Sequence, residues 1–282
     1  MIYSQVTGGL GNQFYNYAIG YALAKKNDDH MLIDISAYKF AARPFVLHRF
    51  NLSYGIADLY SPTFNNRFSR MIARIQRKLY TAKGGGCKWM KEEAHSRNKF
   101  YDYDFSYRHN LYLEGYWQNY RYFDEYREGL LEEFAVREET LSLKCIELIT
   151  KVSSENSVAL HIRRGDYESK WCIGEDYYYE AIRQMNSRVP AAKYYIFCED
   201  KEVAAEYLAR IPDSELITGA YELDDIEEFC VMSACRNQII ANSTYSWWAA
   251  YLNRNVDKNV VAPITLHWKE EYYPENWITV DI

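Results

Sequence analysis

The amino-terminal stretch MIYSQVTGGLGNQFYNYAIGYALAKKNDDHMLIDI, residues 1–35, decides the fold class. Residues 1–6 predict a short strand, residues 12–26 a helix and residues 31–35 a second strand, with the glycine turn TGGLGNQ (7–13) after the first strand. A strand, a helix and a second strand in this order form a βαβ unit with parallel strands. The sequence therefore predicts an α/β protein.

A second alternating series begins at residue 157. Its expected strands are 157–163, 194–198, 215–218, 238–241 and 259–262, and its expected helices are 176–189, 201–210, 225–235 and 244–253. The middle is less regular, with helices expected over 65–79 and 120–136 and a strand over 111–117. We expect two doubly wound, Rossmann-like domains, residues 1–150 and 151–282.

The composition argues against several classes of function. Of 282 residues, 48% are hydrophobic, and 39 acidic against 33 basic side chains give a net charge of −6, which argues against a nucleic-acid partner. The start lacks the regions of a signal peptide, so we expect a soluble, cytoplasmic protein. The six cysteines form no C-x-x-C pair and the six histidines are scattered. We expect free thiols and no metal.

The strongest local signal is HIRRGDY, residues 161–167, directly after the expected strand. Two adjacent arginines at a strand end present guanidinium groups that match the charges of a diphosphate. Asp166 could orient an arginine, bind a hydroxyl or act as a base. A salt-bridged arginine pair at a strand terminus is the alternative.

Two further strand-to-helix junctions carry polar residues. In TGGLGNQ, Gly8, Gly9 and Gly11 let backbone amides approach a ligand at a helix amino end, although a simple tight turn would also explain them. In ANSTYSWWAAYL (241–252), the residues Asn242, Ser243 and Thr244 either bind a phosphate or only cap the helix. Parallel strands end at one edge of a sheet, so the second junction, Arg163–Asp166 and Glu199–Asp200 should share one cleft.

Together these segments resemble the α-1,2-fucosyltransferases of glycosyltransferase family 11. The resemblance covers nearly the whole chain, through GGLGNQ with YNYAIGYALA, LYLEGYWQNYRYF (111–123), HIRRGDY, YYIFCED (194–200) and NSTYSWWAAYL in that order. It implies a GT-B fold of two facing Rossmann-like domains, the first on the acceptor side and the second binding GDP-fucose. It also implies inverting transfer without a metal. Tyr245 and Glu199 stand where the family more often has Phe and Asp.

The resemblance also implies residue roles. Arg163 and Arg164 would hold the diphosphate and stabilise the departing GDP, and the acceptor's proton would go to Asp166, or to Glu168 as second candidate. Asp166 tied structurally to an arginine is the alternative. The remaining residues of the expected donor site are His161, Asn242, Ser243, Thr244 and Asp200 in the second domain and Gly9, Asn12 and Gln13 in the first. Asn12 and Gln13 would reach toward fucose or the transferred oxygen.

Two other functions stay open. Asp102 and Asp104 form a D-x-D that could hold a divalent cation, as in a metal-dependent nucleotide-sugar transferase. The 28 tyrosines could instead stack on sugars in a non-catalytic carbohydrate-binding protein, which would not need paired arginines. A phosphate-binding NTPase fits less well, because no P-loop lysine is present.

The acceptor expected from the resemblance is a galactose-terminated oligosaccharide of a surface polysaccharide or lipopolysaccharide, carried on a lipid. Residues 65–91 contain eight basic side chains and no acidic one, and Phe68, Met71, Ile72, Ile75 and Leu79 recur at helical spacing. One interpretation is a solvated basic face over an ordinary core stripe. The other is peripheral contact of the basic helix 65–79 with the inner face of an anionic membrane, for which Arg70, Arg74 and Arg77 are the test positions.

Overall fold

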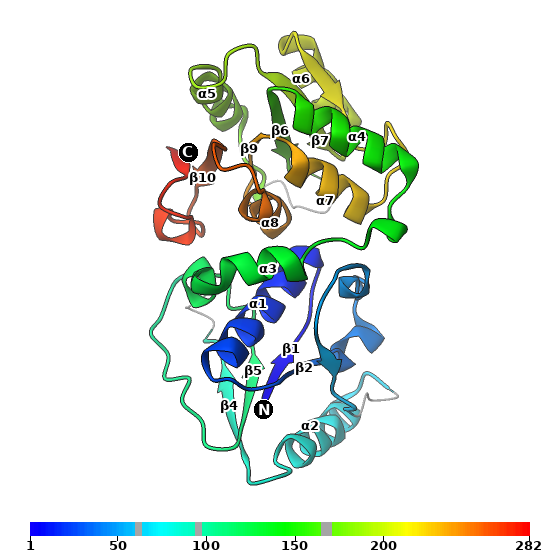
Figure 1. The fold of residues 1–282 in the computed structure, drawn as a ribbon, viewed down its shortest axis with the longest axis vertical. Helices are drawn as coiled ribbons and strands as arrows, with labels where there is room; N and C mark the ends of the chain where they lie inside the picture. The colour runs from blue at the N-terminus through cyan, green and yellow to red at the C-terminus, as the bar shows by residue number, and fades with distance from the viewer. Residues whose placement is uncertain (60–63, 94–97, 165–170) are drawn as a thin grey trace. The chain divides into compact units, whose positions relative to one another are not determined.

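The computed structural model describes residues 1–59, 64–93, 98–164 and 171–282. The chain divides into two compact units, Met1–Ala135 and Val136–Ile282. Each unit is built on a parallel sheet with helices packed against it (Figure 1). Two α/β units are what the alternating pattern predicts, although the division lies 15 residues before the expected boundary at 150.

The first unit contains, in its described part, a five-stranded sheet in the order β3-β2-β1-β5-β4, with every neighbouring pair parallel. β1 is the central strand, and ligands of open α/β sheets bind at the carboxyl ends of the strands. The elements are β1 (Ile2–Gln5), α1 (Leu10–Lys26), β2 (Met31–Asp34), β3 (Gly55–Ile56), α2 (Arg67–Thr81), β4 (Cys87–Lys91), β5 (Asn110–Glu114) and α3 (Arg127–Glu133).

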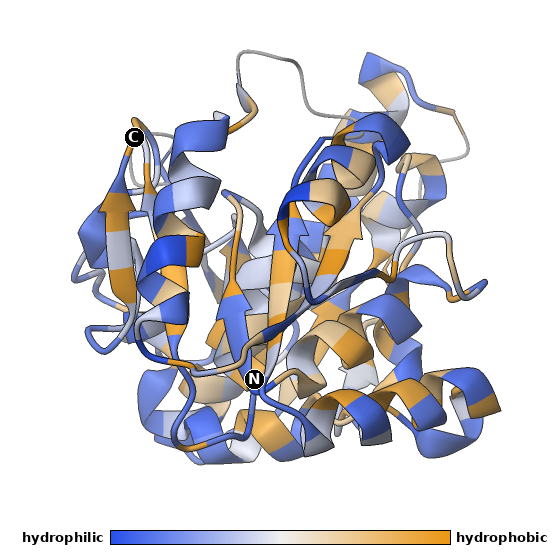
Figure 2. Ribbon diagram, turned by 90° about the horizontal axis from the view of Figure 1, so that it is seen from above, coloured by the Kyte–Doolittle hydropathy of each residue, from blue (hydrophilic) through white to orange (hydrophobic). Residues whose placement is uncertain are grey.

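Both faces of this sheet are covered. On one face Ile2 packs with Ile19 and Leu23 of α1, and on the other face Tyr3 packs with Tyr112 and with Tyr80 of α2. Because successive strand residues point to opposite faces, a strand covered on both sides is apolar at nearly every position. Figure 2 shows hydrophobic residues concentrated along the strands, with both kinds of residue on the helices.

The second unit contains, within its described residues, a six-stranded parallel sheet in the order β11-β10-β9-β6-β7-β8. Counted from β6 along the chain this order is 3-2-1-4-5-6, the order of dinucleotide-binding folds. The elements are α4 (Leu143–Ser154), β6 (Ser157–Ile162), α5 (Glu175–Asn186), β7 (Lys193–Cys198), α6 (Lys201–Arg210), β8 (Ser214–Leu216), α7 (Asp225–Ala234), β9 (Asn237–Ile239), α8 (Thr244–Leu252), β10 (Val260–Ile264) and β11 (Ile278–Asp281).

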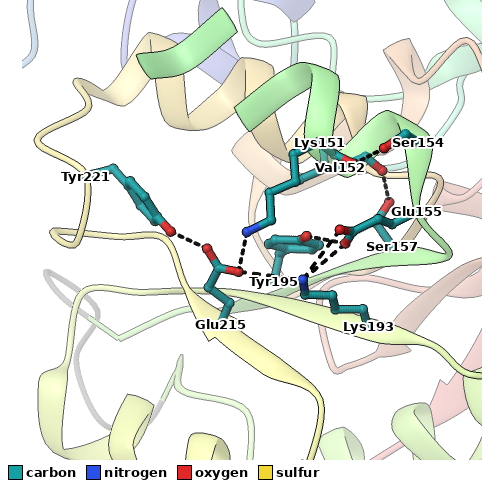
Figure 3. A network of polar contacts seen from close by, with 9 residues as sticks. All are labelled: Lys151, Val152, Ser154, Glu155, Ser157, Lys193, Tyr195, Glu215 and Tyr221. Atoms are coloured by element: carbon teal, nitrogen blue, oxygen red, sulfur yellow. Dashed lines mark hydrogen bonds and ion pairs between the residues drawn. The ribbon is translucent and has the colours of Figure 1, made fainter. Parts of the chain in front are cut away.

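Helix α4 explains where the chain divides. Lys151 of α4 lies 2.7 Å from Glu215 of β8, and Glu155, just after α4, lies 3.3 Å from Lys193 of β7 (Figure 3). The Ser157 hydroxyl donates to the Val152 carbonyl at 2.6 Å. The helix also packs on α7. These bonds join α4 to the second sheet, so the division lies before the helix and not within it.

Helix α8 is the aromatic centre of the second unit. Trp247 and Trp248 are fully buried. The Trp247 ring stacks on Tyr251 at 4.8 Å between centroids and lies 5.6 Å from Trp277, just before β11. The body of the helix is therefore fixed in the core, while its amino end follows β9.

The expected helix over 120–136 is wrong in its first half. Two 3-10 turns, Tyr120–Tyr122 and Asp124–Tyr126, precede α3. The Asn119 side chain accepts from the Arg121 amide at 3.1 Å and starts the first turn. The expected strand over 111–117 ends at Glu114, because the chain turns through Gly115, with a φ of 152°, and Trp117, with a φ of 55°.

Candidate active site

The carboxyl ends of β6 and β9 form the centre of the candidate site in the second unit. The two strands are neighbours, with Leu160 paired to Ile239, and the strand order changes direction between them. Arg163 and Arg164 follow β6, and Asn242 to Thr244 follow β9. The fold thus brings together two sequence-predicted segments more than 70 residues apart at the position where open α/β sheets bind ligands.

The two arginines turn to different neighbours. Arg163 Nη1 lies 3.4 Å from the Glu199 carboxylate, at the end of β7. Arg164 Nη1 donates to the Ile173 carbonyl at 3.1 Å. Partial burial lowers the pKa of Arg164, but Cys172 and then Tyr178 raise it above its usual value overall, so the guanidinium stays charged. Both charges remain at the same strand end.

His161 lies on β6 beneath these arginines and is 7% exposed. Its ring lies 6.0 Å from the Tyr245 ring of α8. Burial, and secondarily the positive charge of Arg163, lower the pKa of His161 to about 3. Nδ1 is buried and has no hydrogen-bond partner among the described residues. His161 is therefore a neutral imidazole that offers a hydrogen bond and not a charge.

The junction of β9 and α8 presents an amino end of a helix. Ser243 occupies the N-cap position, yet within the described residues its side chain makes no capping bond. The Asn242 side chain donates to the Trp171 carbonyl at 2.9 Å. The first amides of a helix have no partner within the helix, so the start of α8 at Thr244 suits an anion. The interpretation of Ser243 as a simple side-chain cap is not supported by this geometry.

Asp200 and Glu199 have separate tasks at the end of β7. Asp200 caps α6, accepting from the amides of Glu202 and Val203 at 3.1 Å each. Its carboxylate is thus used locally, whereas Glu199 faces Arg163. We expected Asp200 in the donor site, and the structure places Glu199 nearer to the arginines.

In the first unit, the glycine turn is tied to the end of β5. Gly8 has a φ of +80°, and Gly9 is the N-cap of α1 with open space where a Cβ would stand. The Asn12 Oδ1 accepts from Gln118 Nε2 at 2.7 Å. Asn12 therefore lies at the carboxyl end of its own sheet, where open α/β sheets bind ligands.

Asn16 was not among the predicted residues, although it organises this turn. It is fully buried; its Oδ1 accepts from the Thr7 amide at 3.0 Å, and its Nδ2 donates to the Gly115 carbonyl at 2.6 Å. One side chain thus holds the segments after β1 and β5 together. A second amide within the apolar run of α1 was the available signal.

The side-chain amide of Gln13 is bonded entirely to the backbone of neighbouring loops. Its Nε2 donates to the carbonyls of Gly8 and Pro44 at 3.0 and 2.8 Å, and its Oε1 accepts from the Val46 amide at 3.0 Å. The side chain is fully buried. We therefore assign Gln13 to positioning the glycine turn and the 44–46 segment, in place of the donor contact expected from the sequence.

The two candidate bases, Asp166 and Glu168, lie outside the described residues.

The D-x-D motif was the candidate metal site. Asp104 of this motif lies beside the amino end of β4, where Ser106 and Lys88 bind its carboxylate and lower its pKa to about 2. Among the described residues, no group of three His, Cys, Asp or Glu side chains is placed to hold a metal. None of the described helices combines the length and apolar character needed to cross a bilayer.

Comparison with known sequences gives consistent matches. The family model of glycosyl transferase family 11 matches residues 61–281. The chain is 32% identical to the O-antigen biosynthesis glycosyltransferase WbnK of Escherichia coli, over 93% of each chain. It is 29% identical to an α-1,2-colitosyltransferase of Escherichia coli over 100% of this chain and 99% of that one. It is 25% identical to galactoside α-(1,2)-fucosyltransferase 2 of Hylobates lar over 87% of this chain and 67% of that one.

Among solved structures, the fold is similar to that of fucosyltransferase NodZ from Bradyrhizobium, with a TM-score of 0.55. The match covers 88% of this chain and 92% of that one at 14% identity. The neighbour has the GT-B fold, and two parallel-sheet α/β units are present here. The expected GT-B fold is confirmed.

Proposed function

Because this chain belongs to glycosyl transferase family 11, we propose that it is an inverting α-1,2-fucosyltransferase. It would move L-fucose from GDP-fucose to the 2-hydroxyl of a terminal galactose in a surface glycan of the O-antigen type. Glycosyltransferase activity follows from the family. The donor, the acceptor and the linkage are the proposal, which the names of the relatives support.

The observation that carries this proposal is the junction of β6 and β9. Arg163 and Arg164 follow one strand, and the amino end of α8 follows its neighbour. A diphosphate carries two adjacent anionic groups, which guanidinium forks and free helix amides bind through complementary charge and hydrogen bonds. We assign the diphosphate to this junction, with Ser243 and Thr244 on the side of α8 and Arg164 on the side of β6.

The end of β7 suits the nucleoside. In this strand order β7 is the second strand, after which dinucleotide-binding folds carry an acidic residue for the ribose hydroxyls. Glu199 occupies that place, and its carboxylate is half exposed beside Arg163. We assign Glu199 to the ribose and Asp200 to the start of α6. Neutral His161 would donate or accept one hydrogen bond from beneath the phosphates.

The chemical step needs positive charge near the departing GDP and a base near the acceptor hydroxyl. The acceptor hydroxyl attacks the anomeric carbon on the face opposite GDP, and the bond from that carbon to the phosphate oxygen breaks with its electron pair staying on GDP. Arg164 and Arg163 would stabilise the negative charge that develops there, which a divalent cation does in other transferases. The proton of the acceptor goes to a carboxylate, Asp166 first and Glu168 second. We therefore propose transfer without a metal.

The first unit would supply the acceptor side. Gly9 leaves open space at the amino end of α1, and Asn12 stands in the first turn of this helix. We propose that Asn12 contacts the transferred sugar or its new oxygen, with Gln118 orienting its amide through the 2.7 Å hydrogen bond. Asn16 then acts as a positioning residue, because it holds the turn that carries Asn12.

A second candidate donor is a GDP-linked colitose. The α-1,2-colitosyltransferase is similar to this chain from end to end. Colitose is L-fucose without its 3-hydroxyl, so the two donors share the nucleotide and the reacting carbon. A site that binds the 3-hydroxyl would reject colitose, because buried polar groups would lose their partner.

The test measures GDP release in EDTA from GDP-fucose and from GDP-colitose, with and without lactose. Lactose-dependent release from GDP-fucose, with a product cleaved by an α-1,2-specific fucosidase, is the expected result. Faster release from GDP-colitose would identify the second donor. Saturable lactose binding without release from either donor would favour a carbohydrate-binding protein, and activity restored only by a divalent cation would contradict the metal-free step.

Two variants locate the diphosphate. Arg164→Ala should lower turnover by about 100-fold or more, as removal of a charge-stabilising donor does. Arg164→Lys keeps the charge but not the forked guanidinium group, so its turnover should lie between that of the wild type and that of Arg164→Ala. Arg183→Ala is the matched control, since Arg183 is an exposed arginine of α5 that pairs with Glu180. Equal GDP affinity in all three folded variants would remove the arginine pair from the donor site.

A further inference from the structure

Helix α2 turns most of its large apolar residues away from the sheet, although Ile72 is half-buried. Phe68, Met71, Ile75 and Leu79 are 66%, 51%, 50% and 67% exposed, and Phe64, just before the helix, is 67% exposed. These positions recur every three or four residues and form one stripe. A surface helix normally buries such a stripe, so the interpretation of this segment as an ordinary core stripe is wrong.

The opposite side of α2 attaches the helix to the first unit. Ala73 and Thr81 are buried. Arg77 Nε lies 2.9 Å from the buried Asp34 carboxylate of β2, and Tyr80 packs edge-on against Tyr3 of β1 with 6.2 Å between ring centroids. The side held by the sheet is thus small and polar, with one aromatic ring. Arg77, expected together with Arg70 and Arg74 on the membrane-facing side, belongs instead to this inner side.

One flank of the apolar stripe is basic. At 100° per residue, the exposed side chains of Arg67, Arg70, Arg74 and Lys78 fall on one arc next to the stripe. Residues 65–91 include no acidic side chain. A helix with a large apolar face beside a basic face lies in the interface of a bilayer, with its cations at the level of the lipid phosphates.

We propose that α2 is a docking surface for an anionic lipid bilayer. The apolar stripe would enter the boundary between headgroups and acyl chains, and the basic arc would contact the lipid phosphates. Contiguous exposed apolar surface on a soluble unit marks an interaction site. The basic arc selects an anionic partner, and the stripe distinguishes a bilayer from a purely polyanionic partner, which would leave it in water. This inference does not depend on the donor or acceptor proposed above.

The test measures co-sedimentation of the full chain with vesicles of phosphatidylcholine alone and of equal parts phosphatidylcholine and phosphatidylglycerol. We expect binding to the anionic vesicles that falls steeply with salt. Each basic residue near such a surface contributes about fivefold in affinity. The double variant Arg70→Gln/Arg74→Gln should therefore bind about 25-fold more weakly.

The apolar face is tested separately. Phe68→Ser/Leu79→Ser should lose about tenfold or more in vesicle affinity, because two large apolar side chains no longer enter the interface. Val256→Ser/Leu266→Ser is the matched control, since these side chains are 92% and 78% exposed but lie in the second unit. Lys26→Gln/Lys201→Gln removes two exposed charges elsewhere.

Three outcomes would overturn the proposal. These are equal binding to both kinds of vesicle, α2 variants that bind as tightly as their controls, and a concentration-dependent dimer in light scattering that only the α2 variants lose. The last result would assign the stripe to a second copy of this chain. GDP release with lactose should stay unchanged in all these variants, which separates a failure here from a failure of the proposed transfer reaction.

Discussion

Acidification should destabilise this protein through one buried side chain, His161. The imidazole is 7% exposed and its pKa in the folded chain is about 3, against 6.5 in the unfolded chain. Between these two values the unfolded state binds a proton that the folded state refuses. Stability therefore falls as the pH drops from 7.5 toward 3, and the loss is complete only below the folded pKa.

The size of this effect follows from the two pKa values. One histidine with this shift costs the folded state about 0.8 kcal/mol at pH 6 and about 2 kcal/mol at pH 5, relative to pH 8. Unfolding in urea, followed by tryptophan fluorescence at pH 8, 6 and 5, measures the loss. In His161→Gln this part of the pH dependence should disappear, whatever the variant's stability at pH 8.

Comparing the pH dependence of the unfolding free energy in wild type and His161→Gln separates the contribution of His161 from that of other groups. Carboxylates that titrate below pH 5 contribute equally to wild type and variant, and His109→Gln controls for loss of an exposed imidazole. If wild type and His161→Gln lose the same free energy between pH 8 and pH 5, the argument that burial keeps this imidazole neutral is refuted.

Three other predictions concern stability. Gly8→Ala should lower the free energy of unfolding by about 1–3 kcal/mol in a thermal unfolding assay, because the residue has a φ of +80° and the new Cβ would lie 2.7 Å from Asn12 Nδ2. In the same assay Gly9→Ala should change it by no more than about 1 kcal/mol, because Gly9 has open space and a negative φ. Arg77→Met should cost about 3–5 kcal/mol in urea unfolding, since it leaves the Asp34 carboxylate buried without its cation; a cost below about 1 kcal/mol would contradict a buried ion pair. Asp200→Ala should lose about 1 kcal/mol through the cap of α6 while GDP affinity stays within about twofold, and a large loss of affinity would return Asp200 to the donor site.

Much of the second unit could be predicted from the sequence. β6 and the segment 239–241, which begins at the last residue of β9, are short apolar runs followed at once by polar residues, and each lies between helical patterns of ordinary length. Local periodicity and the handedness of parallel connections then place both strand ends at one edge. Arg163, Arg164 and Ser243 are therefore predicted at this edge from the sequence alone.

Other features depend on contacts between residues far apart in the chain. Asn16 bonds Gly115 across 99 residues, and Gln118 bonds Asn12 across 106. Local pattern does not encode such partners. Helix α4 was not predicted although it has local signals, an N-cap at Ser142 and buried residues at helical spacing. Its place in the second unit, by contrast, is set by Lys151 and Glu215, 64 residues apart. The edge strands β4 and β11 were also missed, as their partners rather than their patterns define them.

Periodicity also left the orientation of α2 open. The spacing of Phe68 and Leu79 predicts an amphipathic helix, and the structure confirms the helix. Which side faces the sheet was decided by Asp34, a buried acid that requires a cation and takes Arg77. The ion pair between β2 and α2 thus fixes one side of the helix against the sheet, while the apolar stripe lies on another side.

The aromatic anchorage of α8 has a consequence for protein engineering. Trp247 and Trp248 hold the axis of this helix while Ser243 and Thr244 stand at its amino end. Substituting the two small residues changes the chemistry presented to a ligand without relocating the helix. Variants that test the proposed diphosphate site should therefore change these two positions and keep the tryptophans constant, because a displaced helix axis would obscure any effect on ligand binding.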